Sequence, residues 1–190
     1  MTMLAAIGPF DGTISPDIGS DLAGSAIIGN MRGFSFTLAL CASLLHGQQF
    51  IPPVEGETLS GNKVSLPAAT GGHSALLIIG FTHGSQNQAK AWSLRVRDRF
   101  PAWSVAVLED IPRLVRGMVA RSIKSGTPRE LHDRFVLVYR GEKQLKQAAG
   151  FDRPDDAYLL VIDPAGAIRW SFHGPVTDAA MEQVGHQFKH

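Results

Sequence analysis

The run from Ser74 to Phe81, Ser-Ala-Leu-Leu-Ile-Ile-Gly-Phe, constrains the fold more than any other part of the chain. From Ala75 onward it contains no polar residue, and its length is that of one strand. Such a run predicts a strand that is buried on both faces, and strands of this kind lie in the centre of α/β sheets covered by helices. The chain is therefore expected to form an α/β domain around this strand.

The segments after this strand alternate between helix and strand patterns. Apolar residues recur every three or four positions over Gln86–Arg99, which predicts a helix with Ser85 as its N-cap. Strands are expected at Ser104–Leu108 and Phe135–Tyr139, with a second helix over Ile111–Ser125 between them. Connections of this length suit parallel strands. The buried face of the first helix is expected to comprise Ala89, Trp92, Val96 and Phe100.

Turn signals mark both ends of the domain. An extended entry leads into a glycine-containing turn over Glu55-Gly56 and Ser60-Gly61-Asn62, which precedes a short strand at Lys63–Leu66. Near the C-terminus, Asp163–Gly166 predicts a tight turn, because Pro164 suits its first central position and Gly166 its left-handed one. The other expected elements are strands at 157–162 and 167–172, a short helix at 142–149 and a last helix capped by Thr177.

Composition is that of an ordinary globular protein. Apolar residues make up 44% of the 190 residues and charged residues 18%. The formal net charge is only +1, so no overall electrostatic attraction to nucleic acid is expected. Nucleic acid is therefore not expected among the partners.

The N-terminal part is typical of an export signal. Met31, Arg32 and the apolar run Gly33–Leu45 resemble a secretory signal peptide, and the run is shorter than the roughly 20 residues of a membrane span. We expect residues 1–30 to be disordered or an upstream extension, residues 31–47 a signal peptide, and residues 48–190 the folded domain. Cleavage would remove Cys41, the only cysteine, and would leave the protein exported, periplasmic or membrane-associated. The alternatives are a buried N-terminal helix or a lipidated Cys41.

This order of elements is similar to the thioredoxin plan, a parallel βαβ half followed by an antiparallel hairpin and a closing helix. The stretch from Ala75 to Trp92 resembles the strand, loop and helix that carry the active site of thioredoxins and peroxiredoxins. The resemblance implies a thioredoxin-like α/β fold, with a central mixed sheet flanked by helices. It aligns the loop Thr82, His83, Gly84 and Ser85 with the active-site loop, and Ser85 with the peroxiredoxin nucleophile.

Serine at this position argues against thiol redox chemistry. That chemistry needs a thiolate of lowered pKa, whereas a serine hydroxyl stays protonated at neutral pH. We therefore expect no catalytic residue and a protein that is not an enzyme. Two enzymatic alternatives remain, a peroxiredoxin-like or other oxidoreductase-derived enzyme and a hydrolase with Ser85 as nucleophile and His83 as base.

A narrower resemblance covers roughly residues 50–185. Gln88 and Trp92-Ser93, the insert around Ile111–Lys124, and the run from Leu159 to Trp170 resemble the family of the mitochondrial ATP synthase assembly factor, a cysteine-less branch of the superfamily. The resemblance implies a non-catalytic assembly factor or chaperone for a membrane complex, with a protein partner such as an ATP synthase membrane-sector subunit. A small-ligand carrier is a further alternative.

The expected contact surfaces are the loop Thr82–Gln88 and the insert helix. The helix pairs an apolar stripe with the basic residues Arg113, Arg116, Arg121 and Lys124, a combination that suits an acidic partner or an anionic membrane surface. The competing interpretation is an ordinary helix that buries Leu114, Val115, Met118 and Val119.

No cofactor or metal site is expected. His186 and His190 are four residues apart near the chain end, without a cysteine to support them. The carboxylates of Asp152, Asp155 and Asp156 are expected to be solvated in a turn. The tryptophans at 92, 103 and 170 are expected to be packing residues.

Overall fold

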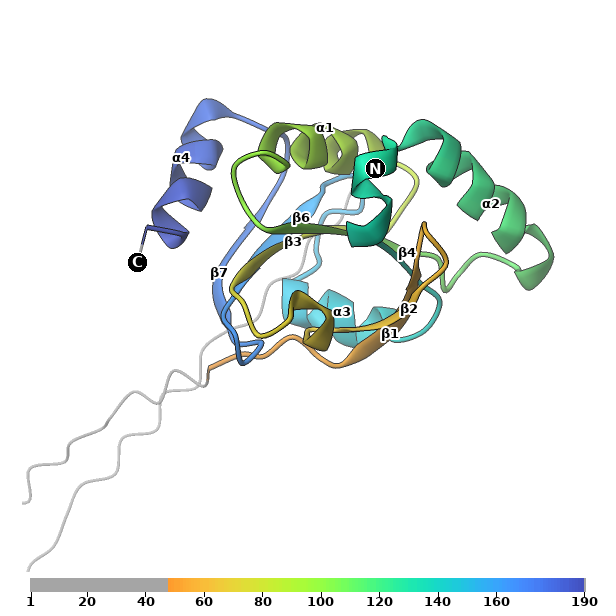
Figure 1. Cartoon of the computed structure of the whole chain (residues 1–190), viewed down its shortest axis with the longest axis horizontal. Helices are drawn as coiled ribbons and strands as arrows, with labels where there is room; N and C mark the ends of the chain where they lie inside the picture. The colour runs from red at the N-terminus through yellow and green to blue at the C-terminus, as the bar shows by residue number, and fades with distance from the viewer. Residues whose placement is uncertain (1–47, 190) are drawn as a thin grey trace, which may run out of the picture. The chain divides into compact units, whose positions relative to one another are not determined.

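The computed structural model describes residues 48–189 and contains one seven-stranded mixed sheet (Figure 1). Its strand order is β2-β1-β5-β4-β3-β6-β7, with β3 at Ala75–Gly80 near its centre. The predicted fold class, a central mixed sheet flanked by helices, is confirmed. The other strands are β1 Val54–Thr58, β2 Lys63–Leu66, β4 Ala102–Val107, β5 Phe135–Val138, β6 Tyr158–Ile162 and β7 Ile168–His173.

Strand β3 is buried along its whole length, as its apolar sequence predicts. Leu76 and Ile78 belong to one hydrophobic cluster, and Leu77 and Ile79 belong to another on the opposite face. This alternation follows from the two-residue period of a strand, which turns successive side chains to opposite faces. The sheet therefore separates two cores, and each requires helices to cover it.

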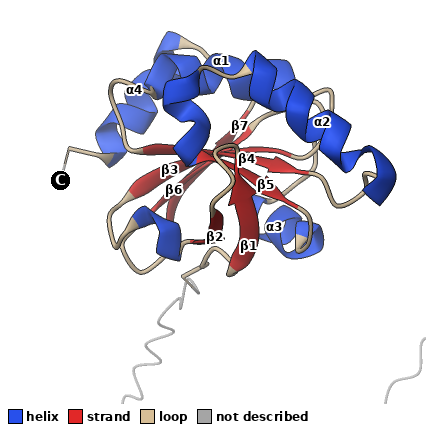
Figure 2. Ribbon diagram, turned by 45° about the vertical axis from the view of Figure 1, so that its right-hand side comes forward, coloured by secondary structure: helices blue, strands red, loops and turns tan. Residues whose placement is uncertain are grey.

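Helices cover the two faces unequally (Figure 2). Helices α1, α2 and α4 lie on one face, and α3 lies on the other. The helical segments are α1 Gln86–Val96, α2 Arg113–Gly126, α3 Glu142–Ala149 and α4 Asp178–Gln187, with 3₁₀ turns at Ala68–Thr70 and Arg129–Arg134. Helix α1 ends at Val96, three residues before the predicted end at Arg99.

The strand directions agree with the predicted plan. Strands β3, β4 and β5 are parallel, with α1 and α2 as the crossovers between them. Strand β6 pairs antiparallel with β3, and β7 pairs antiparallel with β6. The carboxyl end of β3 therefore points to the loop that begins α1, and the segment before β6 returns to the same edge of the sheet.

The predicted turn at Asp163–Gly166 and the predicted helix cap at Thr177 are both confirmed. Gly166 has a φ of +84°, and the Asp163 carboxylate accepts hydrogen bonds from the amides of Ala165 and Ala167, each 2.9 Å long. These two bonds, with an ion pair to Arg169, lower the pKa of the Asp163 carboxyl. Thr177 Oγ1 accepts a hydrogen bond of 3.1 Å from the Ala180 amide and caps α4.

The predicted turn at Glu55–Gly56 is wrong, because both residues lie within strand β1. Gly56 stands opposite Val138 in the antiparallel pairing of β1 with β5. A Cβ atom at Gly56 would lie 2.4 Å from Val136 Cγ1 and 2.8 Å from the Leu137 carbonyl oxygen. The glycine therefore serves the close approach of two strands and not a turn.

The predictions for residues 1–30 and 31–47 and for His190 lie outside the described residues. Among residues 48–189, no helix has the length and apolar character needed to cross a bilayer.

Candidate functional site

The loop Thr82–Ser85 connects β3 to α1 and is closed by its own hydrogen bonds. The Ser85 side chain is fully buried, and its hydroxyl donates to the Thr82 carbonyl at 2.9 Å. The same oxygen accepts from the Thr82 amide at 3.3 Å, while the Ser85 amide donates to Thr82 Oγ1 at 3.3 Å. Ser85 and Thr82 thus hold the two ends of the loop together.

The prediction that the Ser85 side chain caps α1 is wrong. Ser85 has φ −74° and ψ −11°, which are helical values, and its side chain makes no capping hydrogen bond. An N-cap residue normally has extended dihedrals, which direct its side chain toward the amides of the first turn. Here the hydroxyl points back to Thr82 instead.

The loop packs against the segment that precedes β6. Thr82 Oγ1 donates to the Pro154 carbonyl, and the Gln88 side chain accepts from the Ala157 amide at 3.1 Å. A Cβ atom at Gly84 would lie 2.0 Å from Asp155 Oδ1, so the two segments meet without room for a side chain. The edge of the sheet at the carboxyl end of β3 is thus filled by contacts between two loops.

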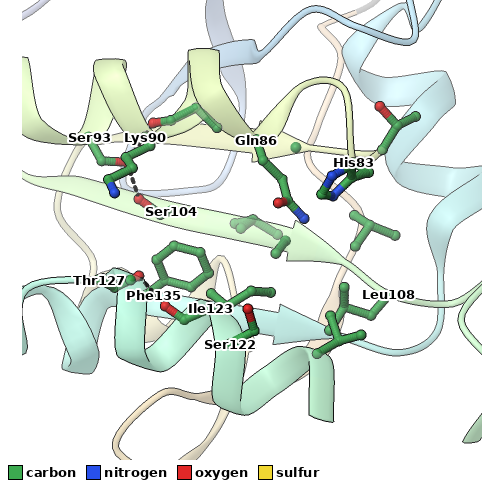
Figure 3. A pocket seen from close by; sticks show the side chains of 18 of the residues that line it. His83, Gln86, Lys90, Ser93, Ser104, Leu108, Ser122, Ile123, Thr127 and Phe135 are labelled. Atoms are coloured by element: carbon green, nitrogen blue, oxygen red, sulfur yellow. Dashed lines mark hydrogen bonds between the residues drawn. The ribbon is translucent and has the colours of Figure 1, made fainter. Parts of the chain in front are cut away.

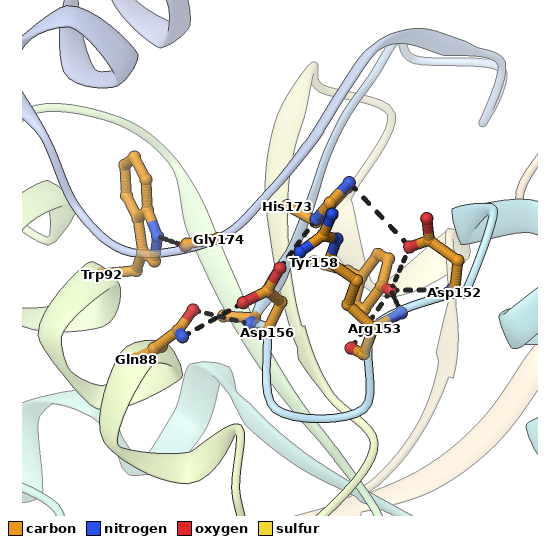
Figure 4. A network of polar contacts seen from close by, with 9 residues as sticks. Gln88, Trp92, Asp152, Arg153, Asp156, Tyr158, His173 and Gly174 are labelled. Atoms are coloured by element: carbon orange, nitrogen blue, oxygen red, sulfur yellow. Dashed lines mark hydrogen bonds and ion pairs between the residues drawn. The ribbon is translucent and has the colours of Figure 1, made fainter.

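Asp156 is the centre of a polar network beside this loop (Figure 4). Its carboxylate lies 2.8 Å from His173 Nδ1 and accepts a hydrogen bond of 3.2 Å from the Gln88 amide. The hydrogen bond to His173 lowers the pKa of the Asp156 carboxyl, against an opposing effect of partial burial. The network links α1, the segment before β6 and strand β7.

Tyr158 extends this network into the core. Its hydroxyl accepts from the amides of Asp152 (2.9 Å) and Arg153 (2.7 Å) and donates to the Asp152 carboxylate at 3.0 Å. The Tyr158 ring stacks on the His173 ring, with centroids 5.4 Å apart. The expectation of a solvated carboxylate is therefore wrong for Asp156, whose side chain is only 19% exposed, whereas Asp152 is exposed as expected and also accepts the Tyr158 hydrogen bond. The carboxylate of Asp155 is exposed, as expected.

A pocket of about 730 Å³ lies between α1 and α2, above strands β4 and β5 (Figure 3). His83 reaches it from the loop before α1 and Gln86 from the first residue of α1. Thr82 lines it as well, so two residues of the predicted loop, Thr82 and His83, contribute to this pocket. Ser85 does not line it. The two residues of the hydrolase alternative therefore have different surroundings, one buried among backbone groups and one at the pocket.

Helix α2 rests on the sheet by a narrow contact and has no buried residue. Val119, Ala120 and Ile123 pack against a cluster that contains Leu108 and Leu137. Leu114 and Met118 face outward, 98% and 67% exposed, and Val115, which lines the pocket, is 40% exposed. The interpretation of α2 as an ordinary helix that buries Leu114, Val115 and Met118 is therefore wrong.

The four predicted basic contact residues divide into two groups. Arg113, Arg121 and Lys124 are exposed. Arg116 instead turns toward the protein, where Nε donates to the Ile111 carbonyl (2.8 Å) and Nη2 to the Glu109 carbonyl (2.9 Å).

The Arg116 guanidinium also lies over the Tyr139 ring, 5.3 Å from its centroid. Burial and the nearby Glu57 charge raise the pKa of Tyr139, and the Arg116 charge opposes them. Arg116 therefore fixes the start of α2, which leaves three of the four predicted basic residues on an accessible surface.

The structure supports packing roles for the tryptophans. Trp92 is fully buried and donates from Nε1 to the Gly174 carbonyl at 2.8 Å, while Trp103 and Trp170 are partly buried against the two cores. Among residues 48–189, no three histidine, aspartate or glutamate side chains form a cluster that could hold a metal ion.

Comparison with solved structures shows a thioredoxin-like fold. An exposed lipoprotein thioredoxin from Streptococcus pneumoniae aligns with a TM-score of 0.50 and 12% identity, over 72% of this chain and 100% of its own. A putative thiol:disulfide interchange protein DsbE from Chlorobium tepidum aligns with a TM-score of 0.48 and 16% identity, over 74% and 93%. ScoI of Arabidopsis thaliana, solved with copper bound, aligns with a TM-score of 0.47 and 11% identity, over 74% and 98%. No protein-family model and no curated protein matches the chain.

Sequence reasoning missed two features of the site. The pairing of Asp156 with His173 joins residues 17 apart across a strand pair, and no local spacing indicates it. The pocket depends on how far α2 stands from α1, which is a property of packing. The outward position of Leu114 and Met118 could be predicted from helical periodicity, because these two residues lie between the basic face of the helix and the stripe formed by Val119 and Ile123.

Proposed function

We propose that this protein is a non-catalytic binding module that assists the assembly of a membrane complex, with a membrane-sector subunit of the ATP synthase as the first candidate partner. The proposal includes export, with residues 31–47 as a cleaved signal peptide and the domain acting at a membrane surface outside the cytoplasm. Its contact surface is the outer face of α2, consisting of Leu114, Met118, Arg113, Arg121 and Lys124.

The exposure of Leu114 and Met118 is the observation that carries the proposal. Two large apolar side chains one turn apart on a helix are costly to leave in water, and burial of each by a partner would contribute roughly 1.5–3 kcal/mol. Exposed apolar groups surrounded by polar residues are typical of protein interaction sites. Two such residues can act as the binding hot spot of an interface, but they do not form a whole interface by themselves.

Charge on α2 indicates the chemistry of the partner. The helix contains Arg113, Arg121 and Lys124 on its accessible side and no acidic residue. An apolar segment flanked by acidic residues would satisfy both parts of this surface. Membrane subunits expose such apolar segments before they are assembled, which is when an assembly factor acts on them.

The buried position of Ser85 supports a non-catalytic role. A serine nucleophile needs a positioned base and open access to its substrate. The Ser85 hydroxyl has neither, because it is buried and donates its proton to the Thr82 carbonyl. The hydrolase alternative therefore has less support than binding.

The test is capture of the partner from native membranes. The full chain, tagged at its C-terminus, would be crosslinked mildly in the cells that produce it, purified and analysed by mass spectrometry. We expect enrichment of an ATP synthase membrane-sector subunit, and loss of that enrichment in a double variant, Leu114→Ser with Met118→Ser. Recovery of the chain without any membrane-complex subunit would overturn the proposal.

A charge-reversal pair separates specific contact from general basicity. Reversal of Arg113, Arg121 and Lys124 to Glu should abolish capture. The matched control reverses three exposed basic residues away from α2, namely Lys63, Arg140 and Lys143, and should leave capture intact. Equal effects of the two triple variants would contradict a specific α2 surface, and retention on anionic vesicles without protein capture would assign the surface to lipid instead.

A further inference from the structure

The pocket between α1 and α2 has two chemically different walls. The α2 wall presents the apolar side chains Val115, Val119 and Ile123. The α1 wall presents mainly polar side chains, namely Gln86, Asn87, Lys90 and Ser93. The floor consists of β4 and β5, including Val105, Ala106 and Phe135. A molecule that fills this pocket would need an apolar side and a polar end.

The volume suits a small molecule. At about 730 Å³, the pocket lies within the roughly 300–1,000 Å³ typical of small-molecule sites. A partner helix, whose diameter with side chains is roughly 10–12 Å, would rest on its mouth and not enter it. The pocket is therefore a site of its own and differs from the outer face of α2 in the residues that form it.

A buried pair of hydroxyls stands at one end of the pocket (Figure 3). Ser93 Oγ and Ser104 Oγ are 2.6 Å apart, and both residues are only 8% exposed. Ser93 donates its single proton to the Ala89 carbonyl at 2.8 Å. The proton between the two hydroxyls must therefore come from Ser104, so both protons of the pair are engaged within the protein.

Lys90 lies beside this pair on α1. Its side chain is exposed at the pocket and forms no ion pair with any of residues 48–189. The one carboxylate in the lining belongs to Asp110, two residues beyond Leu108, and Leu108 lies at the opposite end of the pocket. Charge in the pocket is thus positive at the Ser93–Ser104 end and negative at the Leu108 end.

We propose that this pocket binds a long-chain carboxylate, the class of anionic amphiphile to which fatty acids belong. The carboxylate lies at the Lys90 end, where the ammonium group donates to its oxygens. The alkyl chain runs along Val119 and Ile123 toward Leu108, away from the hydroxyl pair. The opposite orientation would bring the carboxylate to Asp110, which repels it.

Titration calorimetry with dodecanoate tests the proposal, with dodecyltrimethylammonium as a probe of the same chain and opposite charge. Both probes would be used below their micelle concentrations. The native chain should bind dodecanoate at one site. It should bind the cationic probe at least about tenfold more weakly, since one such charge-assisted contact corresponds to about a factor of ten in affinity. Absence of dodecanoate binding, or equal binding of the two probes, would overturn the proposal.

Two variants locate the site. Lys90→Glu, at an exposed position, should weaken dodecanoate binding about tenfold and remove the preference over the cationic probe, whereas Lys143→Glu on α3 should change neither. Val119→Trp should fill the α2 wall and abolish binding of both probes, with circular dichroism as the check that it is folded. An unchanged preference in Lys90→Glu would overturn the assignment whatever the result for Val119→Trp. These outcomes do not depend on membrane-subunit capture, so either proposal can fail alone.

Discussion

The Ser85 side chain is fully buried, and its hydroxyl is engaged with the backbone of Thr82. The residue thus contributes to the shape of the loop. Replacement of Ser85 by Ala removes the acceptor of the Thr82 amide and the donor to its carbonyl. Because an unmet buried polar group costs about 1–3 kcal/mol, we expect Ser85→Ala to lower the free energy of unfolding by that amount.

Urea denaturation would measure this loss, with Ser171→Ala on the exposed side of β7 as the control, expected to change stability by less than about 0.5 kcal/mol. Capture of the membrane partner should be unchanged in Ser85→Ala below its melting temperature. A fully stable Ser85→Ala that has lost an activity on an ester would contradict the structural role and revive the hydrolase alternative.

Asp156 makes the stability of the folded protein depend on pH, and the direction of this dependence follows from its pKa shift. Its pKa in the folded protein is lowered from 3.8, chiefly by the hydrogen bond to His173. The unfolded chain therefore binds a proton more readily, and the stabilisation is present above about pH 3.8 and is lost as the pH falls through the lower folded pKa. We expect Asp156→Asn to be less stable than the native chain near neutral pH, with the difference shrinking below about pH 3.8.

Denaturation at a series of pH values would follow this difference. Asp155→Asn is a close control, because the neighbouring carboxylate is exposed. A difference between native and Asp156→Asn proteins that stays constant from neutral pH to below about pH 3 would contradict the assigned role of the hydrogen bond to His173.

At the scale of elements, the pairing of β1 with β5 depends on Gly56. A methyl group there would collide with Val136 and the Leu137 carbonyl, and the backbone oxygen cannot move away cheaply. Overpacking of this kind costs about 1–3 kcal/mol or more. Gly56→Ala should therefore lower the melting temperature clearly.

Gly117 on α2 is the matched control, since a Cβ atom there meets nothing within 4 Å. In a helix interior, alanine is more favourable than glycine by about 0.5–1 kcal/mol, so Gly117→Ala should stabilise the protein slightly. Differential scanning calorimetry would compare the two variants. If the Gly56→Ala protein were as stable as the native one, β1 and β5 would have to accommodate the methyl group by moving apart without a loss of stability, and the role assigned to Gly56 would be wrong.

Elements whose signal is local were predictable from sequence. The apolar run at Ala75–Gly80 and the turn at Asp163–Gly166 need only their own residues to be recognised. Strand β1 could not be predicted in this way. Its Gly56 is needed because the side chain of Val136, 80 positions further along the chain, packs against it. The site behaves in the same way, since His83 and Ser85 are neighbours in sequence while Asp156 and His173 meet only after β6 and β7 pair.

At the scale of the whole molecule, the stability is unevenly distributed. Every residue of β3 and β6 is buried, whereas α2 has no buried residue. Segments with little buried apolar contact open locally, at a free energy below that of global unfolding. Helix α2 forms one wall of the pocket and also carries the proposed partner surface, so both proposed binding events act on a segment that is expected to open below global unfolding.

Hydrogen exchange followed by mass spectrometry would test this distribution. We expect the amides of β3 and β6 to exchange only through global unfolding, and those of α2 to exchange at least about a hundredfold faster, which corresponds to a difference of about 2.7 kcal/mol in opening free energy. Dodecanoate in the pocket should slow exchange in α2 and leave β3 unchanged, because a ligand stabilises only the state that binds it. Exchange in α2 as slow as in β3 would show that the helix is held as firmly as the sheet, and the exposed Leu114 and Met118 would then lie on a rigid surface instead of a movable one.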